Sequence, residues 1–304
     1  MTSSRYLLGV DIGGSKIAVL AREVRGEKSI YADKLKTPAD EGVGTILQLL
    51  DGQIEKVPGG RAGLKALGVA VPGPVDHTGH VLRAGNLKGW VDIPLREMLE
   101  DRYGVPVYVE RDANCGAIGE KWFGAAKDMS DFAFLSLGTG VGAGLFLDGR
   151  LYRGAHFAAG EAGEMTFPTD DSDAPPPRVS DVVGKRSIQK KAKRATGEKM
   201  SAAEALAKSQ GEPRLERVTE DVVEYLSSLT VAICSLLDPE GIIFGGGTSK
   251  AGDALLKRVR ERAEASSAIR ARLLLAKLGS ESMLYGALWG AEKIADVPEE
   301  KAKR

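Results

Sequence analysis

The hydrophobic and polar positions of the first half of the chain form short apolar runs separated by polar turns. "RYLLGVDI", the turn "GGSK" and "IAVLAREV" predict a hairpin, and "SIYADKLKT" predicts a third strand. Residues 72–93 are punctuated by Pro and Gly and predict a long loop. The remaining predicted elements are a helix over 41–55, the strand "LKALGVAVP", a helix over 94–103, a strand over 105–110 and a helix over 113–122.

The second half begins with the same pattern as the first. "DFAFLSLGTGVGAGLFLDGRL" again predicts a strand, a Gly-rich turn and a strand, which is a weak internal duplication. After it we expect a short helix near "AAGEAGEM", the polar loop "PTDDSDAPPPRVSD", two or three helices over 180–237, the strand "GIIFGGG", another helix, the strand "RLLLAKL" and a closing helix over 281–294. Residues 296–304 are charged and are expected to fray. Strands and helices interleave throughout, so the predicted fold class is α/β.

Composition narrows the class of protein. The chain has 304 residues, enough for two domains of ordinary size or one large one, with 28% charged and 43% hydrophobic residues. The net charge is zero, so no nucleic-acid partner is expected, and no apolar stretch approaches the roughly 20 residues of a membrane span. Cys115 and Cys234 lie far apart, and the opening residues lack a secretory pattern. We therefore expect a reduced, cytoplasmic protein.

Three Gly-rich turns follow predicted strands and are candidate nucleotide sites. In "DIGGSK", Asp11 ends a strand, and the glycines let backbone N–H groups turn toward an anion. Asp11 could hold Mg²⁺ through water, and residues 13–16 could contact phosphates; an ordinary hairpin turn is the alternative. In "LGTGVGAG" the Thr139 hydroxyl could reach a phosphate oxygen, and the glycines of "FGGGTSKAG" could lie against a purine.

The stretch "VPVYVERDANCGAIGE" carries a candidate catalytic group. Asp112 follows an apolar strand and precedes a predicted helix. It could cap that helix, as Asp commonly does. It could instead be a general base at the carboxyl end of a strand, where α/β sheets open their ligand sites. The residues alone favour the cap.

Taken together, the motifs resemble the ROK group of repressors, open reading frames and kinases, in the superfamily that joins sugar kinases, actin and the heat-shock ATPases. The resemblance runs from Leu7 to about Ala291 and rests on "GVDIGGSKIAV", "GVAVPGPVD", "NLKGW", "RDANCGAIGEKWFG", "LGTGVGAGLFLDGRLYRGAHFAAGEAGEM", "LDPEGIIFGGG" and "LYGALWGA". It implies two actin-like (ribonuclease H-like) domains around a central cleft. The implied domains are residues 1–115 with about 283–304, and 116–282.

The resemblance also implies what each residue does. It implies that Asp112 is the catalytic base, that ATP and Mg²⁺ are used, and that the protein is a homodimer. The implied nucleotide contacts are Asp11, Gly13, Gly14, Ser15, Lys16, Gly138, Thr139, Gly140, Gly246 and Gly247. The implied substrate contacts are Gly73, Asn86, Gly89, Arg111, Asp112, Glu161 and Glu164.

The chain departs from the family pattern in three places. Arg111 stands where the sugar kinases usually have Asn, and Glu164 stands where they have His. The family's Cys-rich segment with its sugar-binding Glu is replaced by "PTDDSDAPPPRVSD", so we expect no zinc site. Glu164, three residues after Glu161, would share its helix face and could contact the substrate or lie in a solvated acidic loop with Asp170, Asp171 and Asp173.

Four functions are compatible with these motifs. The leading one is an ATP-dependent hexose kinase, with glucose as the first candidate acceptor. The second keeps the reaction but uses mannose, fructose, an amino sugar or a cyclitol, because of Arg111 and Glu164. The third is a sugar-sensing transcriptional regulator, but the ten residues before Asp11 leave no room for a helix-turn-helix domain. The fourth is a binding protein without catalysis, which Asp11, Thr139 and Asp112 argue against.

Overall fold

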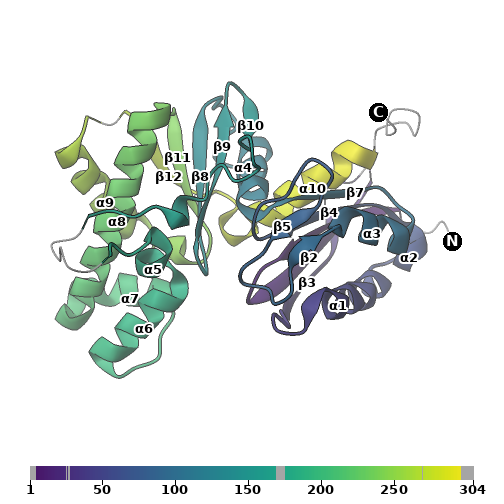
Figure 1. Cartoon of the computed structure of the whole chain (residues 1–304), viewed down its shortest axis with the longest axis horizontal. Helices are drawn as coiled ribbons and strands as arrows, with labels where there is room; N and C mark the ends of the chain where they lie inside the picture. The colour runs from purple at the N-terminus through teal and green to yellow at the C-terminus, as the bar shows by residue number, and fades with distance from the viewer. Residues whose placement is uncertain (1–4, 25, 27, 169–174, 269, 296–304) are drawn as a thin grey trace. The chain divides into compact units, whose positions relative to one another are not determined.

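Two five-stranded sheets organise the chain, and each belongs to its own unit. The structure is a computed structural model that describes residues 5–24, 26, 28–168, 175–268 and 270–295 (Figure 1). The first unit comprises Met1–Gly119, Gly154–Ala158 and Met283–Arg304, and the second comprises Glu120–Arg153 and Ala159–Ser282. The domain boundaries suggested by the sequence, 115/116 and 282/283, stay a prediction.

The first sheet has the order β3-β2-β1-β4-β7. Its strands are β1 (Tyr6–Ile12), β2 (Lys16–Glu23), β3 (Ser29–Lys36), β4 (Leu64–Val71) and β7 (Val107–Arg111). β1, β2 and β3 pair antiparallel, whereas β4 runs parallel to both β1 and β7. Because parallel strands end at one edge of a sheet, Asp11 near the end of β1 and Asp112 just after β7 belong to the same edge.

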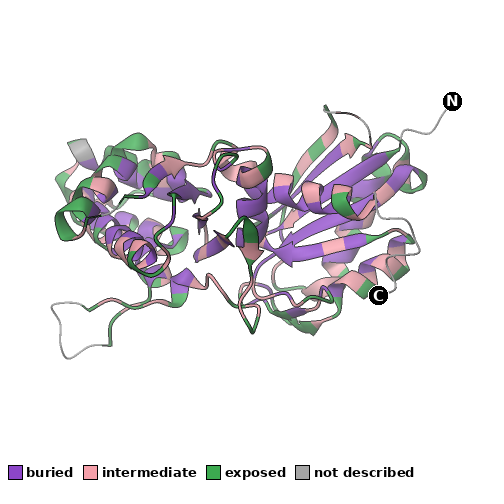
Figure 2. Cartoon of the chain, turned by 90° about the horizontal axis from the view of Figure 1, so that it is seen from above, coloured by how far each residue is buried: buried purple, intermediate pink, exposed green. Residues whose placement is uncertain are grey.

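Alternate residues of β1 serve two different cores, as the two-residue period of a strand requires. Tyr6, Leu8, Val10 and Ile12 pack in the core that contains the buried side chains of α1 and α3. Leu7 packs instead with Leu284 and Leu288 of α10. The helices of this unit are α1 (Gly42–Lys56), α2 (Gly60–Gly63), α3 (Leu95–Tyr103), the start of α4 (Asp112–Trp122) and most of α10 (Ser282–Ala295). Figure 2 shows the buried strands between partly exposed helices.

Close packing of α10 depends on glycine. A Cβ on Gly286 would lie 1.8 Å from the backbone oxygen of Cys115, and one on Gly290 would lie 2.0 Å from the Tyr108 ring. On the sheet, a Cβ on Gly68 would lie 1.8 Å from the backbone oxygen of Ala287. A larger residue would force α10 away from α4 at Gly286, and would force α10 and the sheet apart at Gly68 and Gly290.

The second sheet repeats the pattern of the first, with the order β10-β9-β8-β11-β12. Its strands are β8 (Phe132–Leu137), β9 (Val141–Leu147), β10 (Arg150–Tyr152), β11 (Gly241–Gly245) and β12 (Arg272–Leu275). β8 pairs antiparallel with β9 and parallel with β11, just as β1 pairs with β2 and β4. The structure therefore confirms the internal duplication that the Gly-rich turns indicated.

Helices of the second unit pack on its sheet around one large core. They are α5 (Val179–Val183), α6 (Lys185–Thr196), α7 (Ala202–Lys208), α8 (Pro213–Leu237) and α9 (Asp253–Ser266) (Figure 1). Short 3₁₀ turns accompany them: η1 (Ala162–Glu164), η2 (Ser209–Gly211), η3 (Thr248–Ala251) and η4 (Gly279–Glu281). None of the described helices is long and apolar enough to span a membrane.

The structure corrects the predicted elements in the segments 72–93 and 179–237. The segment 72–93, expected to be a loop, contains the paired strands β5 (Val81–Arg83) and β6 (Val91–Ile93). Strands of three residues are too short to give an alternating pattern. Residues 179–237 form four α-helices rather than two or three, because α5 has only five residues. The acidic loop residues Asp170, Asp171 and Asp173 and the expected fraying end, 296–304, lie outside the described residues.

Candidate functional site

The first glycine turn joins β1 to β2 as a hydrogen-bonded hairpin. The Gly13 N–H donates to the Lys16 carbonyl at 2.9 Å. The Thr37 hydroxyl, just beyond β3, donates to the Gly13 carbonyl at 2.6 Å and steadies the turn. Ser15 and Lys16 are exposed, so their polar groups are open to a ligand. A hairpin and an anion-binding turn are therefore compatible here.

A second loop of the first unit lies against this turn. A Cβ built on Gly14 would be 2.7 Å from Asn86 Nδ2. Asn86 Oδ1 is buried and accepts no hydrogen bond in the described structure. The loop is held by Ala84, whose N–H donates to the Trp90 carbonyl at 2.9 Å, and by the fully buried Trp90 ring. Asn86, which is predicted to contact the acceptor, thus lies beside the Gly14 turn, which is predicted to contact phosphate.

Two further glycines of this region were expected to contact the substrate. Gly73 has a φ of 84°, and a Cβ there would lie 1.8 Å from the Arg83 carbonyl oxygen. Gly73 therefore lets the chain after β4 pass closely beside β5. Gly89 has a φ of 78° and open space around it. Both glycines shape the loop that carries Asn86.

Two carboxylates, Asp11 and Asp112, interact at the same edge of the first sheet. Burial, followed by the nearby charge of Asp112, raises the pKa of Asp11 to about 7, although Lys16 opposes the shift. Burial also raises the pKa of Asp112, against the Arg111 charge and the hydrogen bond from the Ala113 N–H. A raised pKa at a sheet edge is typical of groups that exchange protons.

Asp112 is the first residue of α4, and its Oδ1 accepts a hydrogen bond from the Ala113 N–H at 2.7 Å. Next to it, Arg111 is almost fully buried, at 2% exposure. Arg111 was expected to contact the acceptor, and its burial places it within the protein rather than in solvent. Asp112 thus both begins a helix and remains partly exposed.

A buried carboxylate that the sequence analysis missed supports this helix start. Glu110 is 3% exposed, and its Oε1 accepts hydrogen bonds from the Arg111 N–H and from Asn114 Nδ2, both at 2.9 Å. These bonds tie the last residues of β7 to the first turn of α4. The signal available in the sequence was a Glu near the end of a valine-rich strand, where burial of a charge needs partners.

The second glycine turn, at the end of β8, is held by hydrogen bonds to residues of α5 and α6. The Gly138 carbonyl accepts a hydrogen bond from the Lys185 N–H at 2.9 Å, and the Gly138 N–H donates to the Gly140 carbonyl at the same distance. The Val141 N–H donates to Ser180 Oγ at 3.0 Å. Gly138, Thr139 and Gly140 remain partly exposed, so they can contact a ligand.

The third glycine turn packs on the end of β8. Gly246 has a φ of 85°, and a Cβ there would lie 2.6 Å from the Leu137 carbonyl oxygen. The next glycine, Gly247, has open space beside it. Thr248, which the sequence analysis did not single out, has a buried hydroxyl with no hydrogen-bond partner in the described structure. The second and third turns therefore adjoin within the second unit.

Glu161 precedes a single 3₁₀ turn, η1, and Glu164 ends it, so the two residues do not lie on one α-helix. The Glu164 N–H donates to the Glu161 carbonyl at 3.0 Å, and Glu161 is partly buried. The exposed Glu164 carboxylate lies 3.2 Å from Arg178 Nη1. Arg178 also binds Asp181 through Nε at 2.9 Å. Glu164 therefore has an ion-pair partner from the segment "PTDDSDAPPPRVSD".

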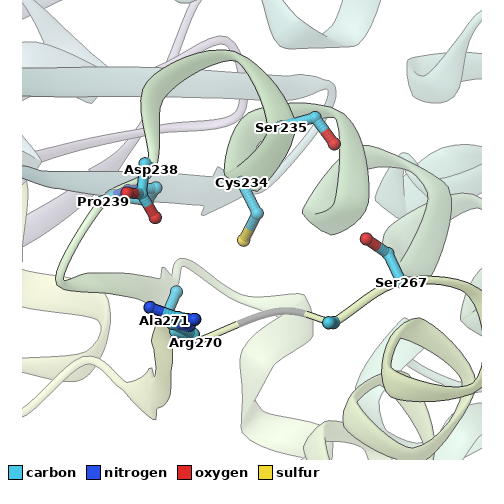
Figure 3. A pocket seen from close by; sticks show the side chains of 8 residues that line it. Cys234, Ser235, Asp238, Pro239, Ser267, Arg270 and Ala271 are labelled. Carbon is cyan, nitrogen blue, oxygen red and sulfur yellow. The ribbon is translucent and has the colours of Figure 1, made fainter.

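No three His, Cys, Asp or Glu side chains of the described residues gather as a metal site. A small cavity of about 100 Å³ lies near the end of α8 and is lined by Cys234, Asp238, Ser267 and Arg270 among others (Figure 3). Burial, with the nearby charge of Asp238, raises the pKa of the Cys234 thiol, which disfavours a reactive thiolate. None of the candidate site residues lines this cavity.

Comparison with known proteins identifies the family of the chain. The family model described as the ROK family matches residues 7–294. The chain is 29% identical to a glucokinase of Halalkalibacterium halodurans, across 94% of this chain and 95% of the relative. It is also 29% identical to a putative xylose repressor of Caldicellulosiruptor sp., across 93% of this chain and 77% of the relative.

A solved structure with bound ligands is also similar. It is a ROK family glucokinase from Streptomyces griseus in complex with glucose and AMPPNP. The sequences are 28% identical, the TM-score is 0.79, and the alignment covers 95% of this chain and 99% of the other. The repeated sheets and the Gly-rich turns described above are thus found in a chain that belongs to the ROK family.

Proposed function

We propose that this protein is an ATP-dependent kinase that phosphorylates a hydroxyl group of a sugar, with glucose as the first candidate acceptor. One observation supports this above the others: Asp112 is a partly exposed carboxylate with a raised pKa, interacting with Asp11 at one sheet edge. A hydroxyl is a weak nucleophile until a carboxylate accepts its proton. The glucokinase relatives support the same reaction class.

In the proposed reaction, Asp112 accepts the proton of the acceptor hydroxyl as its oxygen bonds to the terminal phosphorus of ATP. The bond from that phosphorus to the bridging oxygen breaks, and ADP leaves. The Arg111 charge and the Ala113 N–H both favour the ionised form of Asp112, which the base must have before transfer. Burial acts in the opposite direction and makes the carboxylate a stronger base.

Nucleotide is proposed to bind at the three glycine turns. The Gly13 and Gly138 N–H groups donate to the Lys16 and Gly140 carbonyls, so we propose that other backbone N–H groups of these two turns contact phosphate oxygens. The unpartnered Thr248 hydroxyl and the open face of Gly247 suit the nucleoside. Mg²⁺ would supply positive charge to the transferring phosphoryl group, and Asp11 would hold it through water once ionised.

The identity of the acceptor is open to a second proposal. Arg111 is buried beside the proposed base, Asp112. At position 164 the chain has a Glu, paired with Arg178, where the sugar kinases are expected to have a His. A longer, permanently charged Arg recognises hydroxyls and anions differently from Asn. Mannose, fructose, an amino sugar or a cyclitol is therefore proposed as the alternative acceptor. A sugar-sensing regulator, as in the repressor relatives, is less well supported because it does not require the carboxylate pair.

An ADP-release screen tests the proposed function. The purified protein is incubated with Mg·ATP and a panel of hexoses, amino sugars and cyclitols, and ADP release is compared with a sugar-free reaction. We expect at least one acceptor to raise the rate well above background, and Asp112→Asn to abolish the increase. If no acceptor in the panel raised ADP release, the proposed sugar kinase activity would be refuted. The expected homodimer and cytoplasmic location stay predictions.

A further inference from the structure

Ser180, on the short helix α5, contacts two turns that have separate proposed roles. Its Oγ accepts a hydrogen bond from the Val141 N–H at 3.0 Å, at the end of the second glycine turn. A Cβ built on Gly163, in the middle of η1, would lie only 2.1 Å from the same Oγ. One hydroxyl oxygen therefore lies between the proposed phosphate turn and the proposed acceptor turn.

Other contacts show how little space surrounds this oxygen. A Cβ on Gly140 would lie 3.1 Å from Ser180 Oγ, and one on Gly163 would also lie 2.3 Å from the Val141 carbonyl oxygen. A Cβ on Gly184 would lie 2.4 Å from the Ser180 carbonyl oxygen and 2.7 Å from that of Thr139. The absence of side chains at these glycines lets the three segments approach one another.

Backbone hydrogen bonds join the same segments on both sides of Ser180. The Ala143 N–H donates to the Gly160 carbonyl at 2.7 Å, which ties β9 to the start of the acceptor turn. The Val179 N–H donates to the Met165 carbonyl at 2.8 Å, which ties α5 to its end. Between these two backbone hydrogen bonds, the Ser180 side chain makes a further contact that joins the same segments.

We propose that Ser180 is a positioning residue that couples the nucleotide turn, Gly138–Val141, to the acceptor turn, Glu161–Glu164. This inference rests on the proposed function for the roles of the two turns. Nucleotide bound at Gly138–Gly140 restrains Val141, and Val141 restrains η1 through Ser180. Glu161 is then held in one position only when nucleotide is bound. The residue acts through its neighbours and touches neither reactant.

Amide hydrogen exchange tests the coupling without needing the acceptor. The parent protein and Ser180→Ala are compared with and without Mg·AMPPNP, which binds but is not turned over. In the parent we expect the nucleotide to slow exchange in residues 138–143 and also in 160–165. In Ser180→Ala we expect the protection of 138–143 to remain and that of 160–165 to disappear. A merely structural role would alter both segments whether or not nucleotide is present.

Ser227→Ala is the matched control, because this buried Ser of α8 donates to the Val223 and Val259 carbonyls, at 2.7 and 3.1 Å, away from both turns. It should leave the nucleotide response unchanged. Ser180→Cys fills the space but is a weaker acceptor, so it should behave as Ser180→Ala. If both Ser180 variants fail to fold by thermal melting, Ser180 is a structural residue and the positioning role is refuted.

The outcomes separate this inference from the proposed function. Protection of both segments in Ser180→Ala, or of 138–143 alone in the parent, overturns the coupling and leaves the nucleotide site intact. Protection of neither segment in the parent overturns the nucleotide site and the coupling together. With the best acceptor from the screen, Ser180→Ala should lower kcat/KM for the acceptor about tenfold, the scale of one lost hydrogen bond, and change KM for ATP much less.

Discussion

Asn86 lies against the backbone of Gly14, so closely that a Cβ on Gly14 would be 2.7 Å from Asn86 Nδ2 and 3.1 Å from Asn86 Cβ. Gly14 does not have a positive φ, so space rather than backbone conformation requires glycine there. The loop expected to contact the acceptor and the turn expected to contact phosphate therefore share a packed contact. A change in one should be detected in the other.

Gly14→Ala should weaken acceptor use as well as ATP use. The added methyl group must displace the Asn86 side chain, because the two would otherwise overlap. We expect KM for both substrates to rise in steady-state kinetics with the best acceptor. In an Asn86→Ala background, Gly14→Ala should raise the two KM values much less, since the obstructing side chain is gone. An equal rise in KM in the two backgrounds would show that the contact between Gly14 and Asn86 does not matter for activity.

Gly44→Ala provides the control for this series. Gly44 lies in α1, where an added Cβ would meet no described atom within 4 Å, so nothing obstructs the substitution. Alanine also favours a helix over glycine by roughly 1 kcal/mol. We expect slightly higher thermal stability and unchanged kinetics.

The stability of the ligand-free protein should fall as pH rises toward neutrality, partly because of Asp11. Its pKa is about 7 in the folded protein against an ordinary value of 3.8, so the folded state binds this proton more tightly. The stabilisation of the folded state by the Asp11 proton is complete below about pH 3.8, where the carboxyl is protonated in both the folded and the unfolded state. This stabilisation is lost as pH rises through about 7. Denaturant unfolding across this range measures the trend.

Asp11→Asn should reduce that pH dependence, because the amide does not titrate. Mg²⁺ with AMPPNP should also stabilise the parent more at pH 8 than at pH 6, since a cation prefers the ionised carboxylate. The same slope of stability against pH in parent and variant would place the effect on other groups. Asp40→Asn is a suitable control on the same unit, because Asp40 is exposed.

Much of the fold could be predicted, because the pattern that specifies it is local. The strand–glycine turn–strand units at Asp11 and Thr139 were recognisable in the sequence. The contacts of Asn86 with Gly14 and of Ser180 with Gly163 could not be, because they join segments that only the fold brings together. Glu110 was missed for a related reason: the identity of its partners at Arg111 and Asn114 depends on how β7 meets α4.

Glu164→His should change the ranking of acceptors rather than abolish phosphoryl transfer. The Glu164–Arg178 pair is largely exposed, with 61% and 51% of the side chains accessible, so its loss should change stability little. Arg178→Gln removes the same ion pair from the other side. Acceptor profiles measured for both variants separate the proposed contact of Glu164 with the acceptor from its ion pair with Arg178. A profile identical to the parent in Glu164→His would place Glu164 outside the acceptor site.

Thr139→Val should raise KM for ATP or lower kcat, with acceptor binding nearly unchanged. The valine keeps the shape of the side chain but removes the hydroxyl that is proposed to reach a phosphate oxygen. Thr196→Val is the control, because the Thr196 hydroxyl donates to the Ala192 carbonyl within α6, away from the glycine turns. Unchanged ATP kinetics in Thr139→Val would show that the second glycine turn serves only as a hairpin.

Asp112→Asn should leave the fold intact and remove most of the activity. Asn keeps an Oδ1 that can accept the hydrogen bond from the Ala113 N–H, so α4 should still begin at this residue. The amide cannot accept the acceptor's proton. General-base catalysis is worth roughly 10²–10⁴-fold, so kcat should fall at least about a hundredfold, with much smaller changes in KM for ATP and acceptor.

The measurement pairs kcat with thermal melting for the parent, Asp112→Asn and Asp253→Asn. Asp253 is also the first residue of a helix, α9, but it is exposed and belongs to no candidate site. If Asp112 served only its helix, the two variants would behave alike, with normal turnover and similar melting temperatures. Because Asp112 interacts with Asp11 and its pKa is raised by burial, we expect only Asp112→Asn to lose turnover. An Asp112→Asn protein that keeps most of its kcat would refute both the base assignment and the proposed mechanism.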